Sequence, residues 1–459
     1  MIVMKFGGTS LRDGAAIRKV AALVGRIRDR RPLVVVSAHA GVTDLLEDLA
    51  RNAVGKDHDL DGIRGKHARI LSDLGLDPEL CAPLFRELED LCRGISLVGE
   101  LSPRSRDAVL SFGERLSARI VAAFFRATGL PAEAVEAKEL GMRSSGPFGA
   151  GVLLPDDGRI PKRLEGIEGI PIVTGFLAEG PGGATCTLGR NGSDLSAAFL
   201  GNVCGAEEIQ IWTDVDGVMT ADPKLVPSAR PIASMSFQEA AELAFYGAEV
   251  LHPASLAPAE AKDIPVRVKN THRPDSPGTL LRREFPEEDI PVRCITHKRR
   301  ITLVSVESGR MFAQPGFLAR LFRVFESHGI SVDVVATSEV SVSVTLDTPE
   351  RLDQAVPDLE ALGSVEIERD LGLVCVVGHG IRHRTGVPER VFRPLSSEGV
   401  TIRMVSMGAL KVNLSLVLDQ GDVRTAVSAL HREFFETGVG SPAAGAGSAG
   451  ASLKRTGGR

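Results

Sequence analysis

Aromatic side chains are scarce in this chain, whose 459 residues include one tryptophan and one tyrosine. Stacking platforms for nucleic-acid bases are therefore not expected. The formal net charge of −5 at pH 7 also argues against a broad nucleic-acid-binding surface. The six cysteines are scattered and form no C-x-x-C pair, which excludes a cysteine-rich zinc module and suits a reducing compartment.

Long apolar segments are absent as well. No apolar run reaches 18 residues, and the run at residues 1–4 is too short for a signal-peptide core. We therefore expect no membrane span and a cytoplasmic protein. The motif G-x-x-x-x-G-K-[ST] does not occur, so a nucleotide-binding loop in this chain would not be a P-loop.

The remaining composition is that of an ordinary globular protein. Hydrophobic residues make up 43% and charged residues 25%, with a mean hydropathy of +0.06. The length of 459 residues predicts two to four domains with large cores.

The N-terminus has the pattern of a strand–turn–helix–strand unit. An apolar run leads to Lys5, Gly7 and Gly8 form the turn, residues 15–27 have helical periodicity, and residues 33–37 are the next strand. Glycines let backbone N–H groups approach a phosphate, and a lysine adds positive charge. An ordinary βα turn explains the same pattern equally well.

Three further segments place polar residues after strands or at helix starts. Residues 37–43 are mostly small and follow the second strand, where open α/β sheets bind ligands. Glu114 lies in the first turn of a helix, where a surface carboxylate favoured by the helix dipole is the simpler interpretation. Residues 187–194 combine glycines, an arginine and a helix start, which suits an anion, although Ser193 or Asp194 could be only the N-cap.

Two possible metal sites are weaker. Asp214 and Asp216 follow a predicted strand and could bind Mg²⁺, but an Asx turn is the commoner explanation. His379 and His383 are four residues apart, yet neighbouring glycines break any helix that would align them, so no metal site is predicted. No Ser/His/Asp or Cys/His arrangement is identifiable.

The last third of the chain contains an internal repeat. After the Pro/Gly-rich residues 274–278, short β–α–β patterns begin, and Phe322-Arg323 followed by GISV recurs 70 residues later as Phe392-Arg393 followed by GVTI. This repeat predicts two equal α+β modules. The Gly/Ala/Ser-rich residues 438–459 are expected to be disordered.

Taken together, the motifs resemble the aspartate kinase family of the amino-acid-kinase superfamily. The segments that carry the resemblance are residues 5–10 (KFGGTS), 37–43, 187–194, 212–217 and 250–253 (VLHP). The match extends from residue 1 to residue 436, and the repeat is similar to the tandem ACT domains of that family. Residues 317–340 are most similar to the lysine-inhibited monofunctional type, in its plant-like form.

The resemblance implies an α/β amino-acid-kinase fold, an open mostly parallel sheet flanked by helices, followed by two ferredoxin-like α+β ACT domains. It implies a catalytic domain at residues 1–285, a first ACT domain at 290–370, and a second at 371–437 completed by a strand from residues 291–297. A homodimer through the ACT domains, or a tetramer built from it, is implied as well.

The implied reaction moves the γ-phosphoryl group of ATP, with Mg²⁺, onto the β-carboxylate of L-aspartate. It is the first step toward lysine, threonine and methionine, and L-lysine inhibits it. A carboxylate with a pKa near 4 is already ionised at pH 7, so no general base is needed. Cations and amides that stabilise the transferring group are then the catalytic apparatus, which fits the residues found above.

By resemblance, Lys5 contacts the transferring phosphate, Arg190 binds the substrate α-carboxylate, and Glu114 and Asp194 meet its ammonium group. The implied catalytic residues are Lys5 and Asp194. The implied aspartate-binding residues are Thr43, Glu114, Arg190 and Ser193. The implied nucleotide-binding residues are Lys5, Gly7, Gly8, Thr9, Ser37, Thr213, Asp214, Asp222 and Lys224.

A lysine-binding site is predicted in the first repeat. Asp333 and Glu339 lie beside its strand, whereas the second repeat has Arg403 and Ala409 at the equivalent places. Only the first repeat therefore offers an anionic pocket, which favours a cationic amino acid over threonine. The resemblance adds these pocket residues: Met311, Phe317, Leu318, Ser331, Val332 and Ser338.

Some positions depart from the common family pattern. Asn191 replaces a second glycine, which is tolerable because asparagine accepts the left-handed backbone conformation. Met219 stands where tyrosine is frequent, and Glu249 replaces a lysine. Two alternatives remain: another amino-acid kinase, which would lack the ACT pair, and an inactive ACT-domain amino-acid sensor, which the intact Lys5 and Arg190 disfavour.

Overall fold

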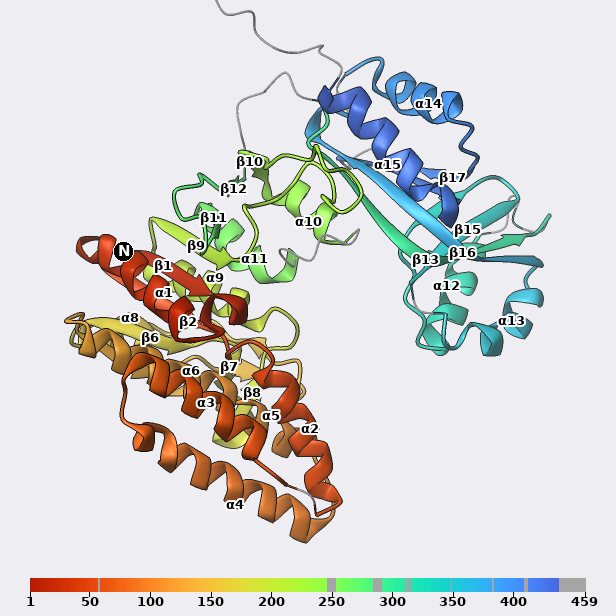
Figure 1. The fold of residues 1–459 in the computed structure, drawn as a ribbon. Helices are drawn as coiled ribbons and strands as arrows, with labels where there is room; N and C mark the ends of the chain where they lie inside the picture. Colours follow the sequence, from red (N-terminus) through yellow and green to blue (C-terminus); the bar gives the residue numbers. More distant parts are fainter. Residues whose placement is uncertain are drawn as a thin grey trace, which may run out of the picture.

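The computed structural model describes residues 1–56, 58–245, 253–283, 291–309, 311, 315–347, 349–381, 384–407 and 412–436. Figure 1 shows an N-terminal α/β region, drawn from red to green, and a C-terminal region drawn from green to blue. Glu249, most of the VLHP sequence, His383, Ala409 and the tail at residues 438–459 lie outside the described residues.

The N-terminal region is built on an eight-stranded, mostly parallel sheet, as the sequence predicts. The strand order across the sheet is β10 (Ser234–Ser236), β12 (Thr279–Arg282), β11 (Val266–Asn270), β9 (Glu208–Thr213), β1 (Ile2–Phe6), β2 (Pro32–Val36), β6 (Ile170–Thr174) and β3 (Ala132–Val135). The pairing of β11 with β12 is antiparallel. Two short hairpins are separate from this sheet: β4 (Ser144–Ser145) with β5 (Val152–Leu153), and β7 (Leu177–Glu179) with β8 (Thr185–Thr187).

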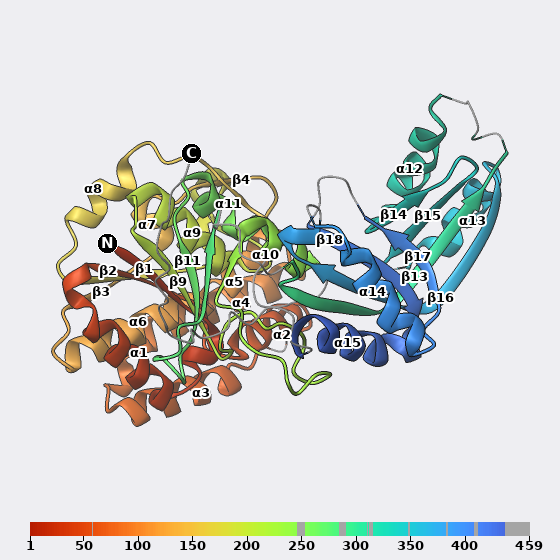
Figure 2. The same cartoon turned by 90° about the horizontal axis from the view of Figure 1, so that it is seen from above.

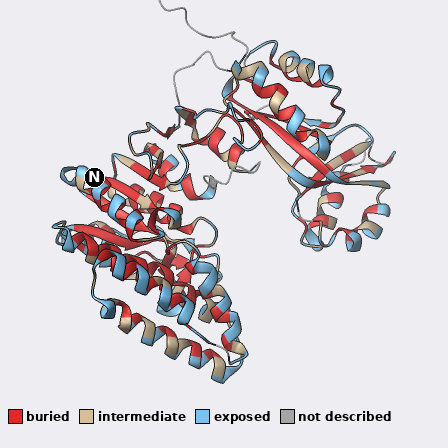
Figure 3. Ribbon diagram, viewed as in Figure 1, coloured by how far each residue is buried: buried red, intermediate tan, exposed pale blue. Residues whose placement is uncertain are grey.

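The central strands are buried along their whole length. Every residue of β2 and β6 is buried, which explains their continuous apolar sequences, because helices cover both faces of a parallel sheet (Figure 3). Alternate residues of β1 enter two different cores: Val3 packs into one face of the sheet, and Ile2 and Met4 into the other.

The helices of this region are α1 (Gly14–Arg26), α2 (Val42–Val54), α3 (Asp61–Leu74), α4 (Ala82–Val98), α5 (Pro103–Leu110), α6 (Phe112–Ala127), α7 (Ala137–Leu140), α8 (Arg159–Glu165), α9 (Gly192–Cys204), α10 (Phe237–Phe245) and α11 (Pro253–Ala261). The helix predicted at residues 15–27 is α1, whose N-cap Asp13 accepts a 2.8 Å hydrogen bond from the Ala16 N–H. The structure therefore confirms the helix, and a side-chain cap fixes where it begins.

The C-terminal region contains the two predicted α+β repeats, joined by one continuous antiparallel sheet. Its strand order is β14 (Val335–Thr337), β15 (Ser341–Leu346), β13 (Cys294–Glu307), β16 (Ser364–Val377), β18 (Asn413–Asp419) and β17 (Ile402–Ser406). Its helices are α12 (Phe317–Ser327), α13 (Leu352–Glu360), α14 (Val387–Ser397) and α15 (Val423–His431). The 14-residue strands β13 and β16 pair along nearly their whole length, so both repeats share them.

The two regions are in direct contact (Figure 2). In β13, the Ile295 N–H donates a 2.8 Å hydrogen bond to the Thr220 carbonyl oxygen. The Thr220 hydroxyl also lies 3.0 Å from Nε2 of His431, a buried residue of α15. Among the described residues, no helix is long and apolar enough to cross a membrane.

Candidate active site

A cavity of about 760 Å³ lies at the carboxyl edge of the parallel strands. Open α/β sheets bind ligands at this edge. Eight of the residues predicted to bind aspartate or nucleotide line it: Lys5, Gly8, Ser37, Thr43, Glu114, Arg190, Ser193 and Asp194. Segments as far apart as β1 and α9 thus meet at one place, as the sequence predicts.

Lys5 and Asp194 form an ion pair at the base of the cavity. The Lys5 Nζ lies 2.7 Å from Oδ1 of Asp194, and only 12% and 8% of the two side chains is exposed. The N-cap of α9 is Asn191 rather than Ser193 or Asp194, so the capping explanation for those two residues is wrong. Because the carboxylate caps nothing, it is free to hold the Lys5 ammonium in place.

Glu114 is 4% exposed, so its interpretation as a surface carboxylate is wrong. Its Oε1 accepts a 3.1 Å hydrogen bond from the Ala38 N–H. Burial raises the pKa of Glu114 to about 8, while that hydrogen bond and the Lys5 charge act in the opposite direction. Gly113 allows this depth, because a Cβ there would lie 2.7 Å from the Cβ of Ala38.

Arg190 lies on a loop with two left-handed residues, Gly189 (φ 73°) and Asn191 (φ 56°). The structure therefore confirms that asparagine accepts this backbone at position 191. Beneath the loop, the Asp107 carboxylate accepts hydrogen bonds from Gly149 and Thr187. Sequence reasoning missed Asp107, because it lies inside an unremarkable helix with no motif around it.

Sequence reasoning also missed an ionic network along the cavity wall. Glu47 accepts hydrogen bonds from Arg106 at 2.9 Å and from Arg51 at 3.2 Å. All three side chains line the cavity. The two guanidinium groups hold the pKa of the Glu47 carboxyl below its usual range, although burial raises it.

The other predicted nucleotide residues are not among the described residues that line this cavity. Thr213 ends β9, the strand that pairs with β1, and the Gly7 N–H donates to the neighbouring Trp212 carbonyl oxygen at 3.1 Å. Locally, Asp214 accepts from the Thr213 hydroxyl at 3.1 Å, and Asp222 accepts from the Lys224 N–H at 2.9 Å. The remaining members of this group are Gly7 and Thr9.

In the turn after β9, which contains Asp214 and Asp216, neighbouring side chains bind the carboxylate of Asp216. Asp216 accepts a 2.7 Å hydrogen bond from the Asn270 amide and pairs with Arg273. No group of three His, Cys, Asp or Glu side chains that could hold a metal ion occurs in the part of the chain that the structure describes.

The predicted lysine-binding residues lie in the first repeat. Ser331, Val332 and Asp333 precede β14, and Ser338 and Glu339 lie in the turn between β14 and β15. The others are Met311, Phe317 and Leu318, at or before the start of α12. Burial and the neighbouring Asp347 raise the pKa of Asp333 to about 7, against the effect of Lys298.

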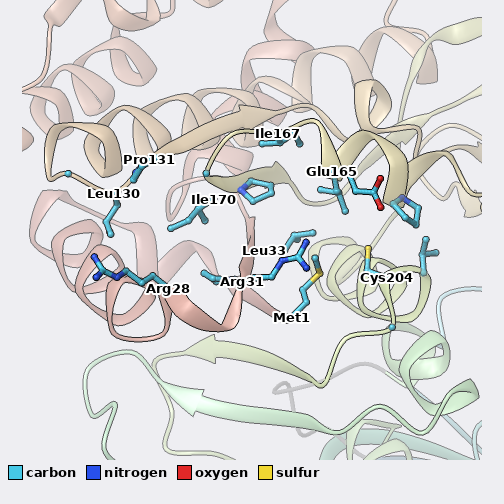
Figure 4. A pocket seen from close by; sticks show the side chains of 18 residues that line it. Met1, Arg28, Arg31, Leu33, Leu130, Pro131, Glu165, Ile167, Ile170 and Cys204 are labelled. Carbon is cyan, nitrogen blue, oxygen red and sulfur yellow. The ribbon is translucent and has the colours of Figure 1, made fainter.

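A second cavity of about 660 Å³ lies at the opposite edge of the sheet (Figure 4). It opens at the amino ends of β2 and β6, where Leu33 and Ile170 line it. Arg28, Arg31 and Glu165 supply its charged groups. None of the predicted site residues belongs to its described lining, so we assign the chemistry to the carboxyl-edge cavity.

Comparison with known proteins agrees with this geometry. The model of the amino acid kinase family matches residues 1–270, and an ACT domain model matches residues 304–361 and 374–434. Aspartokinase 1, chloroplastic, from Arabidopsis thaliana is 40% identical over 458 residues, covering 95% of this chain and 80% of that protein. Lysine-sensitive aspartokinase 3 of Escherichia coli is 36% identical over 460 residues, covering 95% of this chain and 99% of that protein.

Solved structures agree as well. The crystal structure of E. coli aspartokinase III in complex with aspartate and ADP, in its R-state, matches with a TM-score of 0.79 at 36% identity. The T-state complex with lysine and aspartate matches with a TM-score of 0.78. Both alignments cover 95% of this chain and 100% of the solved chain.

Proposed function

The chain belongs to the aspartokinase family, and on that premise we propose that it transfers the γ-phosphoryl group of ATP to the β-carboxylate of L-aspartate, giving 4-phospho-L-aspartate. One observation carries the proposal. The Lys5–Asp194 ion pair lies in the same cavity as Glu114 and Arg190, at the edge of the sheet where ligands bind.

Two anions must meet in this reaction. The aspartate β-carboxylate is already ionised at neutral pH, so the protein has to reduce the repulsion between it and the triphosphate. We assign to Lys5 the stabilisation of the transferring phosphoryl group, because Asp194 holds its ammonium inside the cavity. Mg²⁺ brought by ATP would supply further positive charge to the transferring group.

Recognition of aspartate needs a cation for its α-carboxylate and an anion for its α-ammonium group. Arg190 presents a planar guanidinium that suits the α-carboxylate in a bidentate pair. Glu114 and Asp194 meet the ammonium, and Thr43 and Ser193 line the same pocket. For the nucleotide, we propose the glycine turn at Gly7 and Gly8 with Thr9, Ser37 and the group Thr213, Asp214, Asp222 and Lys224.

We further propose that L-lysine inhibits the enzyme by binding beside Asp333 and Glu339. A homodimer through the C-terminal sheet is supported by exposed apolar side chains on both edge strands, Val335 on β14 and Val405 on β17. For the compartment we propose the cytoplasm, which suits the six free cysteines.

The experiment that tests the function traps the acyl phosphate with hydroxylamine, using L-aspartate and Mg-ATP, with and without millimolar L-lysine. We expect a hydroxamate that disappears when lysine is added. A product indifferent to lysine would leave the kinase intact and remove the inhibitor assignment. A folded protein that binds lysine but forms no product would overturn the kinase proposal in favour of an inactive sensor.

A further inference from the structure

Asp107 is a carboxylate with no exposed surface, on α5 beneath the catalytic cavity. Three donors satisfy it. Its Oδ2 accepts from the backbone N–H groups of Gly149 and Thr187, both at 2.8 Å, and its Oδ1 accepts from the Thr187 hydroxyl at 3.0 Å. A buried charge is costly unless it is hydrogen-bonded, so these contacts must persist together for the carboxylate to stay there.

The donors belong to two segments that meet under the Arg190 loop. The Gly151 N–H donates to the Thr187 carbonyl oxygen at 2.9 Å, which ties the segments to each other. A Cβ at Gly189 would lie 3.4 Å from the Gly149 carbonyl oxygen, so the Arg190 loop rests on the segment that Asp107 holds.

The atoms that Asp107 fixes form part of the cavity wall. Gly149, Thr187, Gly189 and Arg190 all line the cavity, whereas Asp107 lies behind them. Arg190 itself is exposed, so its position depends on its loop rather than on burial of its own side chain. A displacement of about 1 Å in a substrate-positioning group can cost up to about 100-fold in rate.

We propose that Asp107 is a positioning residue for aspartate: by clamping Gly149 and Thr187 it holds the loop that carries Arg190 in the geometry that binds the substrate α-carboxylate. This inference rests on the proposed function of Arg190. It assigns to Asp107 no contact with substrate or nucleotide.

The test compares steady-state kinetics of Asp107→Asn and Asp107→Ala with wild type. Asparagine keeps the size but removes the charge, so the Gly149 and Thr187 N–H groups lose their ionised acceptor, and the new N–H₂ is satisfied only if the Thr187 hydroxyl turns to accept from it. We expect KM for aspartate to rise roughly 10- to 100-fold, while KM for ATP stays within about twofold. Thr187→Val removes one of the three donors and should give a smaller rise. If Asp107→Ala does not fold, Asp107→Asn and Thr187→Val decide the question.

Ser102→Ala is the matched control on the same helix. The Ser102 side chain caps α5 by accepting from the Ser105 N–H at 3.1 Å, so its loss should lower thermal stability without changing KM for aspartate. An unchanged KM in Asp107→Asn, or an equal rise in Ser102→Ala, would reduce Asp107 to a merely structural role and overturn the inference.

Hydrogen–deuterium exchange separates this inference from the proposed function. Amides of residues 186–192 should exchange faster in Asp107→Asn than in wild type, whether or not the protein turns over. Wild-type protein without product, together with faster exchange in the variant, would reject the kinase and keep the clamp. An active wild type with unchanged exchange and KM in the variant would reject the clamp alone.

Discussion

The catalytic cavity and the first repeat each contain a carboxyl group with a buried oxygen atom that has no hydrogen-bond partner among the described residues. Among the residues that the structure describes, neither Oε2 of Glu114 nor Oδ2 of Asp333 has a hydrogen-bond partner. Burial raises the pKa of Glu114 to about 8 and that of Asp333 to about 7. A positively charged group would therefore stabilise the ionised form of both carboxyl groups. Aspartate and lysine each carry such a group, an ammonium.

The neighbours of the two carboxyl groups differ. Lys5 acts on Glu114 and lowers its pKa, so the catalytic cavity already contains a cation before substrate binds. Asp333 instead lies beside a second carboxyl group, Asp347, which forms an ion pair with Lys298. The catalytic cavity thus has Arg190 as well as Lys5 before substrate binds, whereas at Asp333 the charge of Lys298 acts against two carboxyl groups.

The second repeat lacks this property. At the position equivalent to Asp333 it carries Arg403, which lies 3.1 Å from Asp419 and 3.6 Å from Glu368. At this position the second repeat therefore presents a cation that is already paired, instead of a carboxyl group that could bind a cationic ligand.

The largest expected effect comes from removing the charge of Glu114 in the catalytic cavity. Glu114→Gln keeps the hydrogen bond with Ala38 possible but cannot neutralise the substrate ammonium. We expect kcat/KM for aspartate to fall roughly 100-fold, the equivalent of losing one charged hydrogen bond. Lysine binding, measured by calorimetry, should be unchanged. A variant with near-normal kcat/KM would mean that another group meets the ammonium.

The second-largest effect is expected from removing the corresponding carboxyl group of the first repeat, Asp333. Asp333→Ala should remove lysine inhibition, or weaken it at least about tenfold, while the uninhibited rate stays near normal, because a charged hydrogen bond contributes about 1.5–3 kcal/mol. The measurement is the lysine concentration that halves the rate. Inhibition that survives in this variant would place the lysine site elsewhere.

The two raised pKa values predict different pH dependences. Each ligand ammonium must displace a proton from its carboxyl, so both affinities should rise with pH, by up to about tenfold per unit below the pKa. KM for aspartate should fall until the pH passes about 8, and the lysine requirement should level off near 7. Without ligand, the folded state holds these protons more tightly than the unfolded chain, so stability falls as pH rises from the ordinary carboxyl pKa near 4 to the folded-state values of about 8 for Glu114 and about 7 for Asp333.

These pH profiles are measured as KM for aspartate and as half-inhibitory lysine concentration between pH 6 and 9. The Glu114→Gln and Asp333→Ala variants should each flatten only their own profile. Coincident profiles for the two ligands would contradict the difference between the sites.

The smallest expected effect concerns Lys298, which contacts residues of both regions. The Lys298 ammonium pairs with Asp347 and lies 4.7 Å from the centre of the Phe245 ring, at the end of α10. Lys298→Met should lower the half-inhibitory lysine concentration by up to roughly threefold, since it removes a cation that competes with the ligand ammonium for Asp333 and Asp347, and partly exposed pairs contribute up to about 1 kcal/mol. The matched control is Arg403→Ala, in the second repeat, which should leave lysine inhibition unchanged. Equal effects of the two substitutions would remove the distinction between the repeats.

Much of the fold could be predicted because its signals are local. A parallel α/β region is indicated by the continuous apolar strands and the Gly7–Gly8 turn, and a repeated α+β region by the repeat 70 residues apart. The structure confirms both fold classes. The resemblance predicts that a strand from residues 291–297 completes the second repeat, but not that β13 and β16 each run through both repeats, since their partners lie 34 or more residues away along the chain. Pairing over such distances leaves no periodic signal in either strand.

The sequence by itself determined which residue types this protein has for its chemistry: a lysine after an apolar strand, an arginine between left-handed residues, and acids in one repeat only. The tertiary structure decided how those groups are charged and held. Glu114 and Asp194 each allowed an ordinary local explanation, and only burial beside Lys5 removed it. Asp107 became visible only in three dimensions, because its donors, Gly149 and Thr187, are 42 and 80 residues away. A carboxylate's pKa and function depend on what surrounds it in space, and the chain order does not record those neighbours.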